Sequence, residues 1–395
     1  MSEMSYLEKL LDGVEVEWKT LEDISIKISS GGTPKTGVSE FYDGDIPWLR
    51  TQEVNFCDIW DTEVKITESG VKNSSAKWIP KNCVIVAMYG ATVGKIGINK
   101  IPMTTNQACA NIQLNEEVAH YRYVFHFLCS QYTYIKSLGT GSQTNINAQI
   151  VKNIKIPIPC PDNPEKSLAI QSEIVRILDT FTALTAELTA ELTMRKKQYN
   201  YYRDQLLSFD EGEVEWKTLG EVAVIGTGNH DTQDAIEHGK YIFYARGREP
   251  LKLNVFDFDE TAIITAGDGA GVGKVFHYAK GKYALHQRAY RIVPNAFMNP
   301  RFVYHYITAY FFTYIQKASV SSSVTSLRRP MFLKFPIPVP PSEEQARIVE
   351  ILDKFDTLTN SITEGLPREI ELRQKQYEYY RDLLFSFPEP EAVNK

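Results

Sequence analysis

The heptapeptide EVEWKTL stands at residues 15–21 and returns unchanged at residues 213–219. A second string, Gln-Tyr-x-Tyr-Tyr-Arg-Asp, occupies residues 198–204 and returns at residues 376–382. Each string and its copy lie about 180 to 200 residues apart, far more than the roughly 20 to 50 residues of a solenoid repeat. Each copy is therefore predicted to be a whole domain followed by a helix.

Two weaker echoes keep the same order. Ile-Pro-Ile-Pro at residues 156–159 corresponds to Phe-Pro-Ile-Pro at 335–338, and the pattern Ile-Val-x-Ile-Leu-Asp-x-Phe at 174–181 returns at 348–355. Between these strings the two copies differ. The chain therefore keeps a constant frame and varies what the frame carries, which suggests two reading heads on one scaffold.

The order of segments is circular, because Leu10-Leu11-Asp12 precedes the first heptapeptide much as Leu206-Leu207 precedes the second. The predicted divisions are an N-terminal stub, a first variable domain, a first helix, a second variable domain, a second helix and a tail. Their residues are 1–14, 15–162, 163–212, 213–341, 342–387 and 388–395.

Composition indicates a globular cytoplasmic protein of 395 residues, with 43% apolar and 12% aromatic residues. The five cysteines form no Cys-x-x-Cys pair, so the sequence predicts neither a disulfide framework nor a zinc site. The first residues lack a signal-peptide core, and no apolar run reaches the roughly 18 residues of a membrane span. We expect no membrane partner.

Charge is uneven along the chain, whose net charge is −6. Residues 240–334 carry fourteen Lys/Arg against five Asp/Glu, a balance of +9, and residues 69–160 carry nine against two, or +7. Residues 342–395 carry seven against twelve, or −5. Basic domains on acidic helices suit a phosphate backbone, although ordinary solvating lysines remain an alternative.

Both helices have predicted starting signals: an Asn163-Pro164 N-cap and a capping box at Ser342 and Gln345. Apolar residues then recur in steps of four and three, which is the heptad pattern of a coiled coil. The second seam, which includes Ile362, has an extra step of four at Gly365-Leu366-Pro367, where proline should kink or break the helix. Antiparallel pairing of the two helices is the simplest arrangement, and separate packing of each helix on its own domain is the alternative.

The variable domains mix short β-type runs, such as 84–88 and 262–265, with aromatic helical stretches such as 121–135 and 303–315. The predicted fold class is therefore α+β: two β-rich mixed domains joined by two long antiparallel helices, in a pseudo-two-fold circular repeat. Trp18 and Trp216 are expected to anchor cores rather than to stack on a ligand.

Two glycine-rich turns correspond between the copies, GATVGK at 90–95 and GAGVGK at 269–274. Each has three residues between the first glycine and Gly-Lys and lacks the following Ser/Thr, so neither is a Walker loop. A turn that offers backbone amides and one lysine to a DNA phosphate is preferred over a purely structural turn.

Asn, Gln and Arg are the side chains that hydrogen-bond base edges bidentately in the major groove. Such residues recur at corresponding places: 106–107 against 286–288, and the polar runs 141–147 against 321–329. The candidate DNA-binding residues are Lys35, Arg50, Thr92, Lys95, Asn106, Gln107, Gln143, Asn145, Asn147, His230, Arg246, Arg248, Lys274, His286, Gln287, Arg288, Arg328 and Arg329. No catalytic residue and no metal ligand is predicted, because no methyltransferase, zincin or serine-hydrolase motif is present.

These features resemble the specificity subunit of type I restriction–modification systems over nearly the whole chain. The tandem Thr-Ala-Glu-Leu (TAEL) units at 185–188 and 189–192 resemble those of the type IC branch. The resemblance implies a non-catalytic chain with two target-recognition domains that read a bipartite, asymmetric double-stranded DNA target across a spacer. It also implies that the number of TAEL units is related to spacer length.

The resemblance further implies partners that do the chemistry. Two modification subunits would bring S-adenosylmethionine and adenine methylation, and restriction subunits would bring ATP- and Mg-dependent translocation and cleavage; this chain would hold no cofactor. The candidate docking residues are Gln198, Tyr199, Tyr201, Tyr202, Arg203, Gln376, Tyr377, Tyr379, Tyr380 and Arg381. The competing classes are a coiled-coil scaffold whose β-rich domains bind protein or carbohydrate, and a self-sufficient methyltransferase or nuclease.

Overall fold

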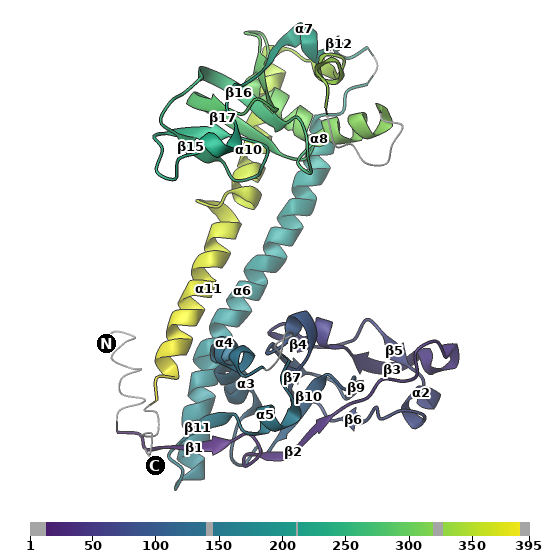
Figure 1. Ribbon diagram of the computed structural model, residues 1–395, viewed down its shortest axis with the longest axis vertical. Coiled ribbons are helices and arrows are strands. Elements are labelled where there is room, and N and C mark those ends of the chain that lie inside the picture. Colours follow the sequence, from purple (N-terminus) through teal and green to yellow (C-terminus); the bar gives the residue numbers. More distant parts are fainter. Residues whose placement is uncertain (1–12, 140–144, 211, 319–326, 388–395) are drawn as a thin grey trace. The chain divides into compact units, whose positions relative to one another are not determined.

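The computed structural model describes residues 13–139, 145–210, 212–318 and 327–387 (Figure 1). Most of the predicted stub (1–14) and the tail (388–395) lie outside these ranges. The chain forms two compact units: Met1–Glu187 with Ile370–Lys395, and Leu188–Glu369. Each unit therefore contains one β-rich domain, part of the long helix α6 (Pro164–Leu206) and part of the C-terminal helices.

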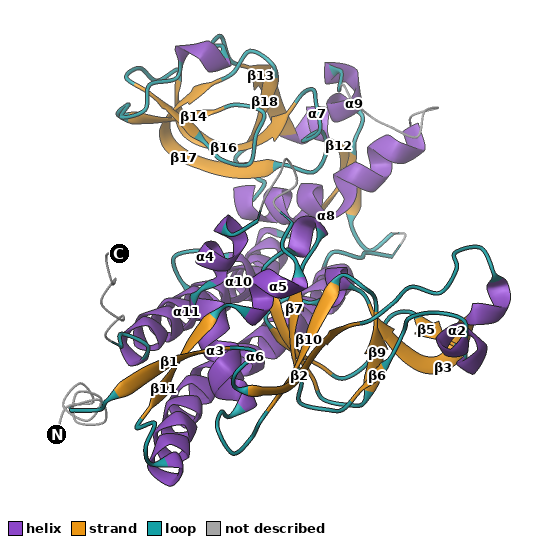
Figure 2. Ribbon diagram, turned by 60° about the horizontal axis from the view of Figure 1, so that its bottom comes forward, coloured by secondary structure: helices purple, strands orange, loops and turns teal. Residues whose placement is uncertain are grey.

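The first domain contains two sheets and a short ribbon (Figure 2). The five-stranded sheet has the order β2 (Ser25–Ser30), β10 (Cys109–Leu114), β7 (Val84–Ala87), β8 (Ile96–Asn99) and β4 (Cys57–Ile59). The four-stranded sheet has the order β5 (Lys65–Ile66), β3 (Tyr42–Leu49), β9 (Met103–Thr105) and β6 (Trp78–Ile79). The helices are η1 (Ser39–Phe41), η2 (Thr51–Glu53), α2 (Glu68–Lys72), η3 (Gly90–Thr92), α3 (Tyr121–Ser130), α4 (Tyr132–Ser137) and α5 (Ala148–Lys152).

The second domain contains one larger sheet and its own ribbon. The sheet has the order β13 (Ala223–Thr227), β18 (Ala289–Pro294), β16 (Phe258–Ala266), β17 (Phe276–Leu285), β14 (Tyr241–Tyr244) and β15 (Leu251–Leu253). The helices are α7 (Leu219–Val222), η4 (Thr232–Asp234), α8 (Pro300–Ala318) and α9 (Arg329–Leu333). The predicted α+β architecture is confirmed.

The two domains share a five-strand plan that their sequences conceal. In both, four strands pair antiparallel in the same order, β2-β10-β7-β8 and β13-β18-β16-β17, and a fifth strand, β4 or β14, joins in parallel. The equivalent hydrogen bonds Met88 N to Ala108 O and Gly267 N to Arg288 O fix the correspondence between the domains. Positions in one domain can therefore be matched with positions in the other.

The repeated heptapeptides become the first strands of two antiparallel ribbons. Strand β1 (Val16–Thr20) pairs with β11 (Lys155–Pro159), and β12 (Glu215–Thr218) pairs with β19 (Pro336–Val339). Trp18 lies opposite Pro157 and Trp216 opposite Pro338. The predicted correspondence of 156–159 with 335–338 is therefore wrong by two residues, and the equivalent segment is 337–340.

The tryptophans of the ribbons pack edge-on against helix aromatics. Trp18 lies 6.0 Å from Phe127 of α3, and Trp216 lies 6.4 Å from Tyr306 of α8, measured between ring centroids. Trp18 borders the first core, as expected, whereas Trp216 is 42% exposed. Trp216 is therefore only a partial anchor.

Each main core joins a sheet to the long helices that carry the repeated strings. In the first unit, the sheet and α3 pack with Ile174 and Leu178 of α6 and with Leu384 and Phe387 near the C-terminus. In the second unit, the equivalent partners are Leu207, which directly follows α6, and Ile348 and Leu352 of α10 (Ser342–Asn360). The C-terminal residues thus complete the first core as residues near 207 complete the second, in agreement with the circular order.

The start of α6 is as predicted, because the Asn163 side chain accepts a hydrogen bond from Lys166 N at 3.0 Å. The capping box at Ser342 is wrong. The Gln345 amide is instead buried, accepting from Asn299 N at 2.7 Å and donating to Pro340 O at 2.8 Å. Gln171 does the same in the first unit, with His120 N at 2.8 Å and Val118 O at 3.0 Å.

The second conserved helix is broken, as its stutter predicted. α10 ends at Asn360 and α11 (Gly365–Leu384) begins after four residues. Gly365 has a φ of +79°, and a Cβ there would lie 2.4 Å from Thr357 O, so this position requires glycine. Ile362 lies in the break and is 79% exposed. Its assignment to the apolar seam is therefore wrong.

The two conserved strings pair aromatic rings between the long helices. Phe181 stacks on Tyr380 at 5.1 Å in the first unit, and Phe355 stacks on Tyr202 at 5.5 Å in the second, measured between ring centroids. Such pairs contribute roughly 0.5 to 1.5 kcal/mol beyond their area burial. Residue numbers rise along α6 as they fall on its partners, so the helices run antiparallel.

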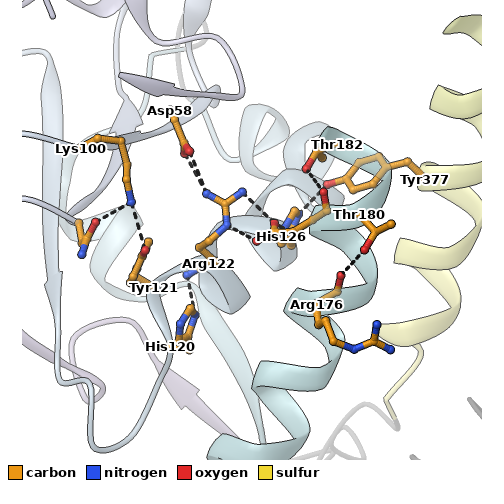
Figure 3. Close-up of polar contacts among 12 residues, drawn as sticks. Asp58, Lys100, His120, Tyr121, Arg122, His126, Arg176, Thr180, Thr182 and Tyr377 are labelled. Atoms are coloured by element: carbon orange, nitrogen blue, oxygen red, sulfur yellow. Dashed lines mark hydrogen bonds and ion pairs between the residues drawn. The ribbon is translucent and has the colours of Figure 1, made fainter. Parts of the chain in front are cut away.

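A polar clasp holds the first domain to α6 (Figure 3). Arg122 of α3 donates to Asp179 of α6 through Nε and Nη2, at 2.6 and 2.8 Å, and through Nη1 to Asp58 at 3.0 Å. His126, which is completely buried, is bonded through Nε2 to Asp179 at 2.7 Å and through Nδ1 to the Tyr377 hydroxyl at 2.9 Å. The acceptor at Nε2 assigns the proton to that nitrogen, so Nδ1 accepts from Tyr377.

The same clasp is built again in the second unit. Arg301 of α8 donates to Asp353 of α10 at 2.6 and 2.9 Å, and His305 Nε2 is bonded to Asp353 at 2.7 Å. Asp356 takes the place of Asp58, 3.3 Å from Arg301. Within the described part of the chain, His305 Nδ1 has no hydrogen-bond partner. The second clasp therefore has one hydrogen bond fewer at its histidine.

Removing the shared carboxylate should loosen the first domain from its helix. Asp179→Asn takes the charged acceptor from Arg122 and His126, and we expect a loss of roughly 1 to 3 kcal/mol in the free energy of unfolding. Thermal unfolding of the purified chain measures this loss. Asp61→Asn, which removes an exposed ion pair with Lys65, is the matched control and should leave the unfolding midpoint unchanged. Equal midpoints for the two variants would contradict the role of the clasp.

The clasp also predicts a pH dependence. Burial lowers the pKa of His126 despite the opposing charge of Asp179, and burial likewise lowers the pKa values of His120 and His286. A lowered folded-state pKa means that the unfolded chain binds protons more readily, so stability is complete above about pH 6.5 and declines as pH falls below it. The thermal unfolding midpoint should therefore decrease when the pH is lowered from 7.5 to 5.5. His126→Gln should reduce this dependence, and a midpoint that is constant or higher at pH 5.5 would disprove the sign.

Candidate DNA interface

Four segments of the second domain meet beside the end of β16. Gly267 N donates to Arg288 O at 2.8 Å, and Leu327 N donates to Gly267 O at 2.7 Å. A Cβ on Gly271 would lie 2.8 Å from Arg246 O, so these two backbone segments are in close contact. The fold thus brings together Arg246, Arg288 and the start of the segment that carries Arg328 and Arg329.

Asp268 joins two of these arginines. Its Oδ1 accepts from Arg246 Nη1 at 3.0 Å, and its Oδ2 accepts from Arg288 Nη1 at 3.1 Å. Burial opposes ionisation, but the hydrogen bonds and charges of both arginines outweigh it and lower the pKa of Asp268. The carboxylate is therefore ionised near neutral pH, and the Arg288 side chain remains 63% exposed.

A cleft of about 470 Å³ opens at this place, lined by Arg246, Arg248, Asp268, Lys274 and the glycine-rich turn. Lys274 Nζ lies 4.9 Å from the centroid of the Phe312 ring, so a cation–π contact supports it. Three basic side chains surround one acidic side chain. The cleft therefore has the charge expected of an anion-facing surface, with one carboxylate in its wall.

The two glycine-rich turns have matching backbones. Gly90 and Gly269 have φ values of +81° and +82°, and Gly94 and Gly273 have +80° and +66°, a region that favours glycine. Each turn leads into a strand rather than a helix, which removes the helix N-terminus that a Walker loop uses. In the first domain Lys95 Nζ bonds Asn55 Oδ1 at 2.8 Å. Whether these turns meet phosphate stays a prediction.

The first domain places its candidates in several roles. Arg50 is paired with Glu63 at 2.7 Å, Thr92 donates to Thr51 O at 2.8 Å, and Asn147 caps α5. These three side chains already have intramolecular partners. Lys35 is exposed in the loop after β2, and Gln143 lies outside the described residues.

Asn106 and Gln107 come just before β10, where their match, His286 and Gln287, precede β18. Asn106 Oδ1 accepts from Ala108 N at 3.1 Å, and exposed Gln107 accepts from the Thr33 hydroxyl. Asn145 Oδ1 accepts from Gly90 N at 3.4 Å, which links the polar run to the glycine-rich turn. The structure therefore brings the predicted polar stretches of this domain to one place.

The two candidate histidines of the second domain, His230 and His286, support its loops rather than face outward. His286 is 1% exposed, and its Nδ1 accepts from Arg288 N at 2.9 Å. His230 Nε2 is bonded to Asp257 at 3.0 Å. Gln287 is exposed and donates to Asp231 at 3.0 Å. His286 thus orients Arg288 through the backbone.

Two features of the structure, the Asp268 contacts and the clasp, are not among the sequence predictions. Asp268 was overlooked because acidic residues are uncommon partners of DNA, yet it lies in a glycine-rich stretch between arginines. The clasp has a readable signal, because Arg-Tyr-Val-Phe-His at 122–126 returns as Arg-Phe-Val-Tyr-His at 301–305. Both strings precede a repeated Ile-Leu-Asp whose aspartate completes the clasp.

The docking candidates divide into inward and outward residues. Tyr377 bonds His126, and Tyr199 borders the second core, where burial raises its pKa to about 12. Tyr201 and Tyr379 are 62% and 56% exposed. Each exposed ring meets the following tyrosine at 5.4 Å between centroids and 76° between planes, in both copies. Their neighbours are equally matched, with Arg203 bonded to Asp204 and Arg381 to Asp382.

The described residues lack two features, a metal cluster and a membrane-spanning helix. They contain no group of three or more His, Cys, Asp or Glu side chains placed to hold a metal ion. No helix among them is long and apolar enough to cross a membrane.

Comparison with known proteins gives one consistent family. The type I restriction modification DNA specificity domain matches residues 13–194 and again 211–372. The specificity subunit of the Escherichia coli type I restriction enzyme EcoR124I/EcoR124II is 42% identical, with 100% of both chains covered. That of the Escherichia coli enzyme EcoprrI is 40% identical, covering 92% of this chain and 93% of the relative.

A solved structure supports the fold. The S subunit of a type I restriction-modification system from M. genitalium matches with a TM-score of 0.65 at 17% identity, covering 96% of this chain and 98% of that one. The two sequence matches and the repeated domain plan agree. The chain belongs to the specificity subunits of type I restriction–modification systems, and is a DNA-recognition subunit rather than a catalytic one.

Proposed function

We propose that this chain reads a bipartite, asymmetric DNA target, with one half-site for each domain and a spacer between them. The observation that carries the proposal is the shared five-strand plan with different side chains at matched positions. Ala108 and Tyr89 of the first domain correspond to Arg288 and Asp268 of the second. Two readers with one architecture and different surfaces suit two different half-sites.

The proposed complex contains two modification subunits, which bind S-adenosylmethionine and methylate adenine, and restriction subunits that use ATP and Mg. The matched exposed tyrosines Tyr201 and Tyr379 support two equivalent docking places, because a duplicated surface suits two copies of one partner. The basic cleft favours DNA over the protein or carbohydrate ligands of a coiled-coil scaffold. The tandem TAEL units favour the type IC branch.

Exchange of the second domain tests the proposal. Replacing residues 220–335 with those of another family member keeps the β12–β19 ribbon and the helices, so only one half-site of the methylated sequence should change. Sequencing of methylated adenine in cells that also carry the modification subunit measures the motif. The control is this chain without that subunit, which should give no methylation. A change in both half-sites, or methylation by the chain alone, would disprove the division of labour.

The number of TAEL units is proposed to determine the length of the spacer between the half-sites. Residues 185–192 lie within α6, and the boundary between the two compact units falls between Glu187 and Leu188. A third unit adds four residues, slightly more than one turn, so the seam stays nearly in phase and α6 lengthens by ~6 Å.

Insertion of a third unit should therefore lengthen the preferred spacer by about one to two base pairs, given a rise of ~3.4 Å for each pair. The half-site sequences should stay the same, because neither domain is altered. Methylated-motif sequencing reads both quantities at once. An unchanged spacer in a stable three-unit variant would show that these residues are ordinary helix.

A further inference from the structure

The wall of the basic cleft contains a carboxylate, Asp268, whose negative charge would repel a phosphate. Asp268 lies between Arg246 and Arg288, 3.0 and 3.1 Å from their Nη1 atoms, and both hydrogen bonds leave the other guanidinium donors available. We propose that Arg246, Asp268 and Arg288 form a base-reading triad that recognises the guanine of a G·C pair in the second half-site. This inference rests on the proposed function.

The negative charge of Asp268 makes contact with a base more favourable here than contact with a phosphate. A carboxylate close to a phosphate adds repulsion between two anions, which lowers affinity for every DNA sequence alike. A base edge carries no net charge, and the O6 and N7 acceptors of guanine fit the paired donors of an arginine. A carboxylate that holds an arginine in place is therefore compatible with a base and unfavourable beside a phosphate.

The sheet fixes the backbone positions of Asp268 and Arg288. Ala266 pairs with Ala289 in the sheet, so Asp268 and Arg288 each lie within two residues of one ladder position. Gly267 separates them, and a Cβ there would come within 2.6 Å of Arg288 O. Asp268 then limits the freedom of two long side chains, which reduces the entropy lost when they bind a base.

Arg248 and Lys274 line the same cleft and have a different environment. Within the described part of the chain, neither pairs with a carboxylate, and Lys274 lies over Phe312. Their charge is therefore not offset locally, and they suit the DNA backbone. The cleft with the adjoining Arg288 thus has a base-reading part and a phosphate-binding part.

The described positions of the first domain that match Asp268 and Arg288 do not form such a triad. Tyr89 stands where the second domain has Asp268, and Ala108, which is 7% exposed, stands where it has Arg288. The triad is consequently specific to one reader. It therefore predicts a guanine in the second half-site, through residues whose counterparts at matched positions of the first domain are different.

The test is the methylated motif of the complex of this full chain with its modification subunits, compared with Arg288→Lys and Arg246→Lys. Lysine keeps the charge but loses the fork that pairs with guanine. We expect the preference for one guanine of the second half-site to fall roughly tenfold to a hundredfold, with the first half-site unchanged. Asp268→Asn should relax the same position to a smaller extent.

Arg347→Lys, at an exposed arginine of α10 outside the recognition domain, is the matched control and should leave the motif unaltered. Lys274→Gln should weaken binding to all duplexes alike and reduce its salt dependence. A second half-site without any G·C pair, or an unaltered motif in both arginine variants and in Asp268→Asn, overturns the triad. Absence of any bipartite motif from the wild-type complex would instead disprove the proposed function.

Discussion

The attachment of each recognition domain depends on one aspartate that is shared by an arginine and a buried histidine. Asp179 and Asp353 belong to the conserved helices, whereas their partners Arg122, His126, Arg301 and His305 belong to helices of the variable domains. A buried charge without partners is strongly unfavourable. The position of each domain on its helix is therefore restricted to the arrangement in which all three groups meet.

The contacts that attach the domains to the helices are closely similar in both units, whereas the exposed side chains of the domains differ. The clasps, the buried glutamines Gln171 and Gln345 and the stacked rings recur in both units with closely similar distances. The strand ends that face the cleft carry different residues in each domain. A frame with repeated contacts can present unrelated surfaces in a similar way, which is what a subunit with two different half-sites requires.

The sequence predicted the frame well because exact repeats and heptad spacing are local patterns. The EVEWKTL strings marked the ribbons, Asn163 marked the start of α6, and the stutter near Pro367 marked the break. The prediction of a capping box at Ser342 was wrong because the Gln345 side chain makes tertiary hydrogen bonds to Asn299 and Pro340 instead. The seam assignment of Ile362 failed because α10 already ends at Asn360, and an apolar residue in the break need not be buried.

The candidate recognition surface was predicted only as a set of residue types. Arg246, Asp268 and Arg288 are far apart in sequence and meet only through strand order, which no local pattern encodes. Arg50 and Asn147 have suitable chemistry, but ion pairing and helix capping already occupy them. The clasp was missed because its repeat is interrupted by exchanges between tyrosine and phenylalanine.

Hydrogen–deuterium exchange of the backbone amides in α3 and α8 tests the role of the clasps most directly. In Asp179→Asn, the account predicts faster exchange in α3 and in the adjoining part of α6, while α8 keeps the protection of the unaltered chain. Asp353→Asn should reverse the pattern. Unchanged protection of α3 in Asp179→Asn would contradict the claim that this carboxylate holds the domain on its helix.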